Sequence, residues 1–311
     1  PFFFMCIGKA VLRGRRNETA LDFFKRRTLR FFVSLAAWSF IYFYLIAWLY
    51  HEPMLSPVFA AAAAIRWPIE YHLWFLYALI GIYLMVPIFR WFVRFAPEAD
   101  LRYLVLVWAA FQLAAFCFPW GYQSAGPGQK LIGYGGYLVL GAYLDGISVS
   151  PRTVRLLLAI FVMTVAANSL LVYRFLMHGG GRSELMWNAF LSPTHILSAA
   201  VAFTAARNID FNPFLDRVAW LRRLIRWLNV QSFNIYIVHV VVVELFKTGR
   251  LGFRAEYWVR RCPNVAIPAM IVLVILASGA MCALIQRIPF VSPVLLLVRS
   301  PSVKKRAADT A

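Results

Sequence analysis

The sequence predicts an all-α protein built as a polytopic bundle of membrane-spanning helices. Of its 311 residues, 62% are hydrophobic and only 14% are charged, whereas soluble domains carry about 25% charged residues. The hydrophobic residues gather in runs close to the length of a helix that crosses a bilayer. The clearest run, residues 71–91, reads YHLWFLYALIGIYLMVPIFRW and contains no Asp, Glu, Lys or Arg before Arg90.

We expect about nine spans in this chain, and the first of them is partial. Residues 1–12 are apolar but too few to cross a bilayer alone, so they read as the second half of a helix. The eight complete runs lie near residues 31–50, 72–93, 101–118, 131–144, 154–175, 187–206, 228–246 and 264–286. Because no repeat of fixed period divides them, we expect one domain over residues 1–311, with a polar tail at 300–311.

The segments between the runs have the composition of loops and surface helices. Residues 51–68 contain three prolines and predict a loop with one interfacial helical turn. Residues 119–130 and the glycines at 179–181 predict loops. Residues 208–227 are amphipathic and rich in Arg, which is typical of a helix on the membrane surface. The run 131–144 is rich in glycine and therefore suited to close packing against another helix.

Membrane topology accounts for the formal net charge of +19, so we expect no nucleic-acid partner. If successive loops alternate across the membrane, most of the 32 Lys and Arg residues fall on one side, as is typical of cytoplasmic segments. This topology starts the chain inside the membrane at Pro1. We therefore expect a further helix ahead of Pro1, ten spans in the intact protein, and an N-terminally truncated sequence here.

Arg27 and Arg30 lie three residues apart where a basic segment enters the run 31–50. On a regular helix they share one face. Paired guanidinium groups suit bidentate recognition of phosphates. Basic residues at the end of a span also serve as topological anchors, which is the commoner role. The spacing alone leaves both interpretations open.

His239 lies near the middle of the run 228–246. An ionisable side chain in a membrane span is costly unless it faces protein, so it is a functional candidate. A buried histidine that only hydrogen-bonds to a neighbouring helix is the alternative. Glu244 follows five residues later and does not share the helical face of His239.

His72 lies at the outer edge of the run 72–93, with Glu70, Trp74 and Tyr77 close to it in sequence. The aromatic rings fit the aromatic belt at a membrane interface. A carboxylate and an imidazole beside aromatic rings also fit a site for a sugar acceptor. The five histidines of the chain have no metal-ligand spacing, and the sequence contains no HExxH, P-loop or GxSxG motif. We therefore expect neither a metal nor a bound cofactor.

Five segments, in this order, resemble the acyltransferase-3 family of integral membrane acyltransferases. They are PFFFMCIGKAVL at 1–12, the pair Arg27 and Arg30, HLWFLYALIGIYLMVP at 72–87, GYGGYLVLGAYL at 133–144 and SFNIYIVH at 232–239. The likeness is closest to the branch that O-acetylates surface polysaccharides and enterobacterial common antigen. It departs at Lys9, where an apolar residue is usual, at Asn234, where glycine is usual, and at Val240, where proline is usual.

The resemblance implies an O-acyltransferase of the bacterial inner membrane. It would move an acyl group, expected to be acetyl, from acyl-CoA to a hydroxyl of a cell-surface or lipid-linked saccharide. Acetyl-CoA would act as a substrate, with Arg27 and Arg30 at the donor side. The catalytic histidine of the family lies on a helix that would precede Pro1, and His239 is the candidate base within this chain. The acceptor-side candidates are Glu70, His72, Trp74 and Tyr77.

Two other functions remain open at this point. In a transporter or flippase for a polysaccharide precursor, His239 and the arginine pair would bind substrate or protons. Paired broken helices would favour that function, and the sequence shows none clearly. A non-catalytic member of the family is the other possibility, and a histidine on the preceding helix would argue against it.

Overall fold

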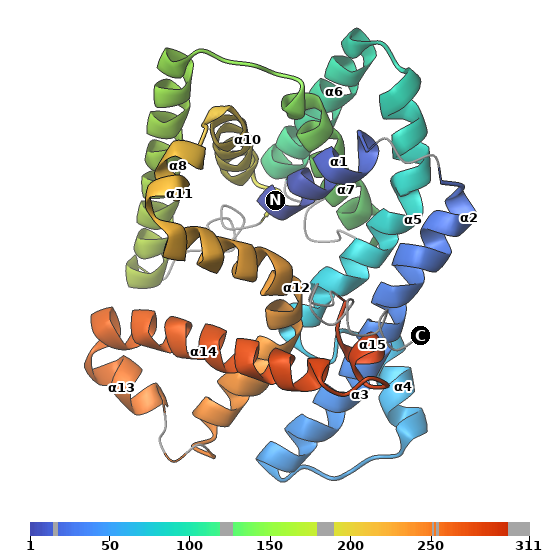
Figure 1. Ribbon diagram of the computed structural model, residues 1–311, viewed down its shortest axis with the longest axis vertical. Helices are drawn as coiled ribbons and strands as arrows, with labels where there is room; N and C mark the ends of the chain where they lie inside the picture. The colour runs from blue at the N-terminus through green and yellow to red at the C-terminus, as the bar shows by residue number, and fades with distance from the viewer. Residues whose placement is uncertain (15–17, 119–126, 179–189, 251, 253–254, 298–311) are drawn as a thin grey trace. The chain divides into compact units, whose positions relative to one another are not determined.

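The computed structural model describes residues 1–14, 18–118, 127–178, 190–250, 252 and 255–297 (Figure 1). Over these residues the only regular secondary structure is helical, and no strand occurs, which confirms the predicted all-α fold. The predictions for most of the loop 119–130, for the glycines at 179–181 and for the tail 300–311 fall outside the described residues.

The chain divides into two compact units. Unit 1 comprises residues 1–23 and 81–211, and unit 2 comprises residues 24–80 and 212–311. Within its described residues, unit 1 contains α1 (Phe2–Leu12), α2 (Ala20–Phe23), α6 (Glu98–Cys117), α7 (Pro127–Asp145), α8 (Pro151–His178), α10 (Pro193–Asn208) and the second part of α5 (Trp74–Phe95). Unit 2 contains η1 (Phe24–Thr28), α3 (Leu29–Tyr50), α4 (Pro57–Arg66), η2 (Tyr71–Leu73), the first part of α5, α11 (Asn212–Arg217), α12 (Ala219–Lys247), α13 (Ala255–Arg261), α14 (Pro263–Gln286) and α15 (Ser292–Leu295). The single domain expected from the sequence stays a prediction.

Six helices of the described residues are long and apolar enough to cross a membrane. They are Ala20–Tyr50, Tyr71–Phe95, Glu98–Cys117, Pro151–Arg174, Ala219–Lys247 and Pro263–Gln286. The described parts of the three other predicted runs lie in or next to the helices α1, α7 and α10, which are not among these six in the part of the chain that the structure describes. The prediction of a multi-pass membrane bundle is therefore confirmed, and six helices within the described ranges meet this criterion.

Two predicted segments differ from the structure. Residues 208–227 were expected to form a surface helix separate from the span 228–246, but α12 runs without interruption from Ala219 to Lys247. No glycine or proline occurs in that stretch, so nothing breaks the helix at residue 227. The predicted loop 51–68 contains the ten-residue helix α4, which starts with proline and is capped by the Ser56 hydroxyl.

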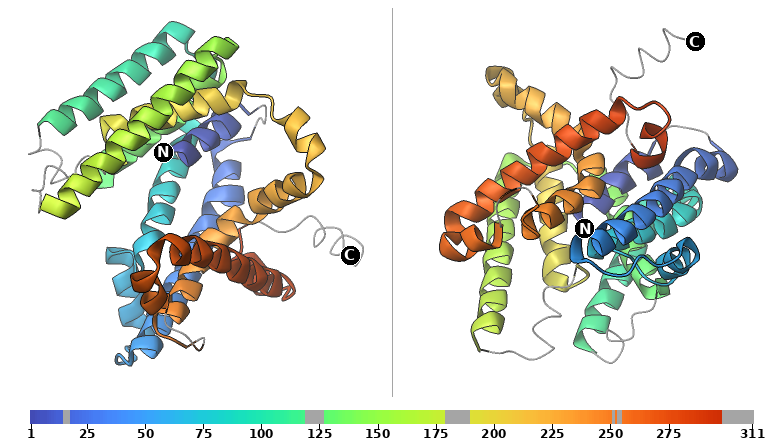
Figure 2. Two further views of the ribbon diagram at one scale, coloured as in Figure 1. Left: turned by 90° about the vertical axis from the view of Figure 1, so that its left-hand side faces the viewer. Right: turned by 90° about the horizontal axis from the view of Figure 1, so that it is seen from below.

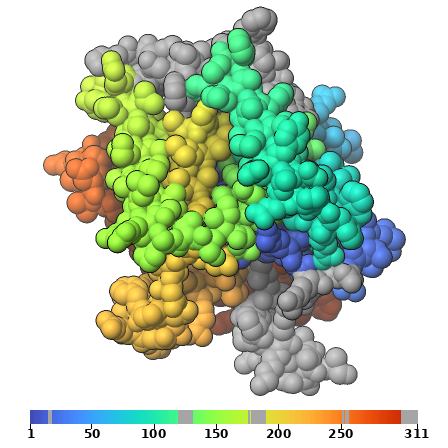
Figure 3. Space-filling view, turned by 90° about the horizontal axis from the view of Figure 1, so that it is seen from above, coloured from blue at the N-terminus to red at the C-terminus, as the bar shows by residue number. Residues whose placement is uncertain are grey.

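In unit 1, α1 packs against α7 through two glycines (Figure 1). A Cβ atom on Gly8 would lie 2.0 Å from the backbone oxygen of Leu138, and one on Gly141 would lie 2.3 Å from the backbone oxygen of Met5. The two helix backbones therefore touch, as the glycine-rich run predicted. In Figure 3, α10 (yellow) lies between α8 (yellow-green) and α6 (blue-green), and it contacts both.

An ion-pair cluster at the end of α7 explains the unusual Lys9. The Asp145 carboxylate lies 2.9 Å from Lys9 Nζ and accepts a hydrogen bond of 2.8 Å from Arg207 Nε. Burial alone would raise the pKa of Asp145, but the hydrogen bonds from the two cations outweigh it and hold the pKa below its ordinary value. Lys9 thus has a protein carboxylate as its partner.

In unit 2, the core forms where α12 packs against α3, η2 and α14. Figure 2 shows α12 (orange) beside α14 (red-orange). Three buried polar side chains stabilise this packing. Gln231 Oε1 accepts hydrogen bonds from Asn234 at 3.0 Å and from Gln286 of α14 at 3.2 Å. Asn234 Oδ1 accepts the backbone N–H of Leu297 at 3.1 Å. Asn234, one of the departures from the family pattern, therefore holds the segment after α15 in place.

Candidate functional site

The structure brings together two histidines that the sequence placed at different sites. His239 lies on α12, and His72 lies in the 3₁₀ turn η2 immediately before α5. Their ring centroids are 5.3 Å apart, with the rings at 72° to each other. Both residues belong to unit 2. An acceptor-side candidate and the candidate base thus form one imidazole pair.

The hydrogen bond of His239 fixes its tautomer. Its Nδ1 lies 2.6 Å from the backbone oxygen of Tyr236, one helical turn earlier. A carbonyl oxygen can only accept a hydrogen bond, so Nδ1 carries the proton. In the neutral ring Nε2 then keeps its lone pair, which is the state required of a general base. His239 is half-buried, so this nitrogen is not sealed inside the core.

Tyrosines hold the imidazole pair in place. The Tyr236 hydroxyl donates to the backbone oxygen of His72 and thereby ties α12 to η2. The Tyr42 ring of α3 lies edge-on to His72, with the centroids 5.0 Å apart. Its hydroxyl donates to the backbone oxygen of Ile237 at 2.6 Å. Two helices, α3 and α12, therefore contact His72 of η2.

His72 is buried without hydrogen-bond partners for its ring. Only 4% of its surface is exposed, and neither ring nitrogen forms a hydrogen bond with any described residue. The Ile237 carbonyl, which already accepts from Tyr42, lies near the ring but not in hydrogen-bonding geometry. A buried polar group without a partner costs about 1–3 kcal/mol. Such a group at a candidate site calls for a functional explanation.

The other acceptor-side candidates surround the pair unevenly. Glu70 is half-buried directly before η2, and burial together with the nearby charge of Glu244 raises the pKa of its carboxyl. Trp74 packs edge-on against Phe75, with the centroids 6.0 Å apart. The Tyr77 hydroxyl donates to the backbone oxygen of Ala64 at 2.5 Å, so it anchors α4.

The arginine pair lies at the other end of α3 from this cluster. Arg27 belongs to the π-helical turn η1 and is half-buried, whereas Arg30 is in the first turn of α3 and is exposed. The π turn interrupts the regular register in which they would share a face. Arg30 precedes Tyr42 by twelve residues, so about 18 Å along the helix axis separates Arg30 from the ring that contacts His72.

Sequence reasoning missed the role of Tyr42, because nothing near position 42 distinguishes it from the other aromatic residues of its run. Tyr236 was visible as a polar residue three positions before His239, and that spacing could have suggested their contact. Among the described residues, no group of three or more His, Cys, Asp or Glu side chains is placed to hold a metal.

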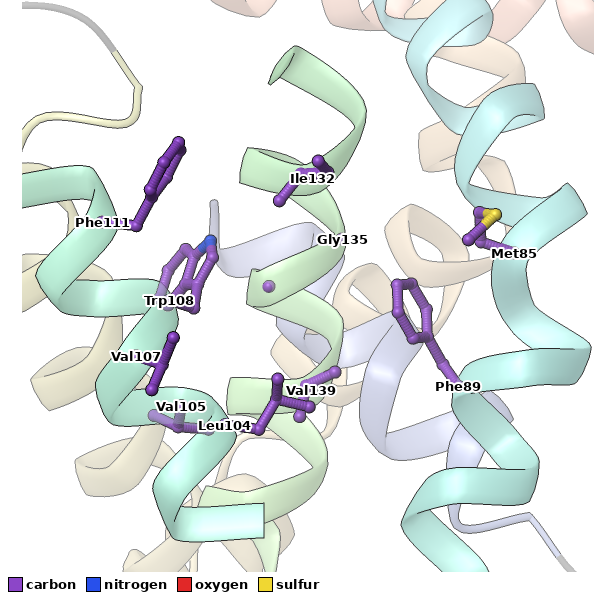
Figure 4. A pocket seen from close by; sticks show the side chains of 11 residues that line it. Met85, Phe89, Leu104, Val105, Val107, Trp108, Phe111, Ile132, Gly135 and Val139 are labelled. Carbon is purple, nitrogen blue, oxygen red and sulfur yellow. The ribbon is translucent and has the colours of Figure 1, made fainter. Parts of the chain in front are cut away.

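Unit 1 contains an apolar cavity of about 360 Å³ between α5, α6 and α7 (Figure 4). Met85 and Phe89 of α5 face Trp108 of α6 across it, and Gly135 of α7 leaves the space between them open. None of the side chains that line the cavity is acidic, basic or nucleophilic. This cavity is therefore unsuited to acid–base chemistry, and the imidazole pair of unit 2 is the candidate site.

A family model described as an acyltransferase domain (Acyl_transf_3) matches residues 1–285, which is most of the chain. No curated protein and no solved structure matches the chain. The matched range includes Arg27, Arg30, His72 and His239.

Proposed function

Because the chain belongs to the acyltransferase-3 family of membrane acyltransferases, we propose that it transfers an acetyl group from acetyl-CoA to a saccharide hydroxyl. The acceptor would be a cell-surface or lipid-linked sugar, and the membrane would be the bacterial inner membrane. The resemblance to polysaccharide and common-antigen O-acetyltransferases supports this choice of acceptor.

One observation carries the proposal for the chemical step. His239 presents an imidazole whose Nδ1 is bound to a backbone carbonyl and whose Nε2 keeps a lone pair. It does so on a helix long and apolar enough to cross a membrane, where an ionisable group is costly unless it has a function.

The reaction then follows from ordinary acyl-transfer chemistry. His239 Nε2 takes the proton from the acceptor hydroxyl while the hydroxyl oxygen attacks the thioester carbonyl carbon. The C–S bond breaks, and the leaving thiolate takes that proton back from Nε2. The products are the O-acetyl ester and free CoA thiol, and the imidazole returns to its starting state.

The donor and acceptor would approach the imidazole pair from different directions. Arg27 and Arg30 would bind the phosphates of CoA, since guanidinium groups bind phosphates well. The separation of about 18 Å along α3 suits a donor whose phosphates and thioester lie at opposite ends of an extended arm. Glu70, His72 and the aromatic side chains of Trp74 and Tyr77 would lie on the acceptor side.

The test is transfer of radiolabelled acetyl from acetyl-CoA to membrane glycolipid. We expect His239→Gln to lower the rate by about 10²–10⁴, the typical contribution of a general base, while acetyl-CoA binding is retained. Arg27→Gln with Arg30→Gln should instead weaken acetyl-CoA binding. Arg261→Gln, on exposed α13, is the matched control and should behave as the parent.

Two results would contradict the proposal. If the folded parent transfers no label, acetyl transfer by this chain is excluded. If His239→Gln transfers at the parental rate, His239 is not the base.

A further inference from the structure

A pocket of about 890 Å³ opens in unit 2 and is lined by residues from the ends of α3 and α12 and from α13. The end of α3 contributes Tyr50 and His51. The end of α12 and the turn after it contribute Lys247, Thr248 and Arg250. The remaining lining residues are Leu49, Glu256 and Val259. The pocket is separate from the imidazole pair, and none of its lining residues takes part in the proton transfer proposed above.

A buried carboxylate organises this lining. Glu244 is only 4% exposed, yet it accepts a hydrogen bond of 2.7 Å from the Tyr50 hydroxyl and one of 2.5 Å from Lys247 Nζ. Its backbone oxygen accepts the Thr248 hydroxyl at 2.8 Å. One buried residue therefore holds three side chains of the pocket in place, which is the arrangement expected of a preorganised binding site.

Arg250 brings a positive charge that the described residues leave unpaired. Its guanidinium lies over the ring of Trp48, 4.8 Å from the ring centroid, and it makes no ion pair with a described carboxylate. The Glu256 carboxylate already accepts from Arg260 at 2.5 Å. The Lys247 charge is likewise balanced by Glu244. The uncompensated charge of the pocket is thus the Arg250 guanidinium, with all its N–H donors available.

His51, which also lines the pocket, has an unusual backbone conformation. His51 adopts φ 58°, ψ 31°, a left-handed conformation that few residues other than glycine adopt. This conformation ends α3 and places His51 in the pocket lining, where its ring forms no hydrogen bond with a described residue. His51 therefore adds an imidazole ring to the lining that also contains Arg250.

We propose that this pocket binds the saccharide acceptor through a negatively charged oxygen group, a carboxylate or a phosphate, held by Arg250. This inference rests on the proposed acyltransferase function and names the chemical class of its acceptor. A guanidinium already oriented by an indole ring binds such a group bidentately. Lys247 and His51 line the same pocket and add further donors.

The pocket lies within reach of the imidazole pair. Lys247 follows His239 by eight residues of one continuous helix, or about 12 Å along its axis. Glu70, two residues before His72, interacts electrostatically with both Glu244 and Lys247. The distance of about 12 Å between His239 and Lys247 along α12 is longer than one sugar ring. The anionic group therefore belongs to a neighbouring sugar or to a linking phosphate, while the acylated hydroxyl lies at the histidines.

The test is isothermal titration calorimetry on the purified 311-residue chain with four small probes. Glucose 1-phosphate and glucuronate carry the two candidate anions, glucose carries none, and inorganic phosphate lacks the sugar. We expect both anionic sugars to bind and glucose to give no signal. Whichever anionic sugar binds more tightly identifies the source of the charge. Inorganic phosphate should bind more weakly than glucose 1-phosphate, because the pocket also contacts the sugar.

Two variants make the test specific. Arg250→Gln should weaken binding of the anionic sugars at least tenfold, and in the acetyl-transfer assay it should raise KM for the acceptor while kcat is unchanged. Arg261→Gln, which removes a nearby charge that does not line the pocket, should bind as the parent does. Elution as a single species in size-exclusion chromatography checks that each variant is folded.

The proposal would be overturned if glucose binds as well as the anionic sugars, or if a folded Arg250→Gln binds them as the parent does. These failures are distinguishable from failure of the proposed function. Acetyl transfer with unchanged binding in Arg250→Gln would refute this site alone. Selective binding of anionic sugars by a protein that transfers no acetyl would refute the acyltransferase function and leave the site in place.

Discussion

The contact between α1 and α7 allows a quantitative prediction for Gly141→Ala. The new Cβ would lie 2.3 Å from the Met5 backbone oxygen and 2.5 Å from its Cα, whereas non-bonded heavy atoms normally pack at about 3.5–4.0 Å. These neighbours are backbone atoms, so relief requires α1 itself to move. Overpacking of this kind costs about 1–3 kcal/mol.

A second effect opposes that cost. Replacing a helical glycine by alanine stabilises the helix itself by about 1 kcal/mol. We expect the steric cost to prevail at Gly141, with a net loss of about 1–2 kcal/mol. A loss of that size lowers the unfolding midpoint by roughly 2–8 °C for a chain of this order of size.

Gly81→Ala is the matched control. Its new Cβ would meet only the end of the Leu131 side chain, at 3.1 Å, and that side chain can adjust. Here the helical gain should offset the contact, so the midpoint should stay the same or rise. Thermal unfolding of the purified proteins in detergent, followed by intrinsic fluorescence, measures both variants. A folded Gly141→Ala that is as stable as Gly81→Ala would refute the backbone contact of α1 with α7.

Three further predictions follow from single side chains. Lys9 and Arg207 hold the pKa of Asp145 below the ordinary value of about 3.9, so the ionised carboxylate stabilises the fold above that pH. This stabilisation is lost as the pH falls through the lowered pKa. Asp145→Asn should therefore make the stability, measured by thermal unfolding, less dependent on pH in the acid range. Tyr236→Phe removes the hydrogen bond to the His72 carbonyl and should lower the free energy of unfolding by about 1 kcal/mol. We also expect a lower acetyl-transfer rate. An unchanged rate would show that this hydrogen bond does not position the imidazole pair. Asn234→Gly restores the residue usual in the family but leaves the Leu297 N–H without its acceptor, and we expect faster proteolysis after α15, seen by mass spectrometry, than in the parent.

The helices themselves were largely predictable. Transfer of apolar side chains into lipid and the need to satisfy every backbone hydrogen bond act on local sequence, so run length and composition indicate where helices form. The errors occurred where local signals were weak. The junction at residues 227–228 was placed by a change in composition, but a helix continues until a residue or a contact ends it, and α12 contains neither proline nor glycine.

The candidate site was only partly predictable. His72 and His239 stood out because an imidazole in an apolar run is unusual. Their contact did not, since it depends on how η2 and α12, 167 residues apart, pack around Tyr42. The contacts of Glu244 were likewise not predictable from the sequence. The sequence showed a carboxylate off the helical face of His239, but its bonds to Tyr50 and Lys247 depend on where α3 ends beside α12.

By itself, the sequence determined that this protein is an all-α membrane protein of the acyltransferase-3 family, because hydropathy and motif order are properties of the chain that need no partner. The tertiary structure alone decided which polar residues act together. It paired His72 with His239, fixed the proton of His239 on Nδ1, and placed Arg250 over Trp48 without an ion-pair partner among the described residues. Each of these depends on directional contacts of a few ångströms between distant segments, and such contacts exist only once the helices have packed.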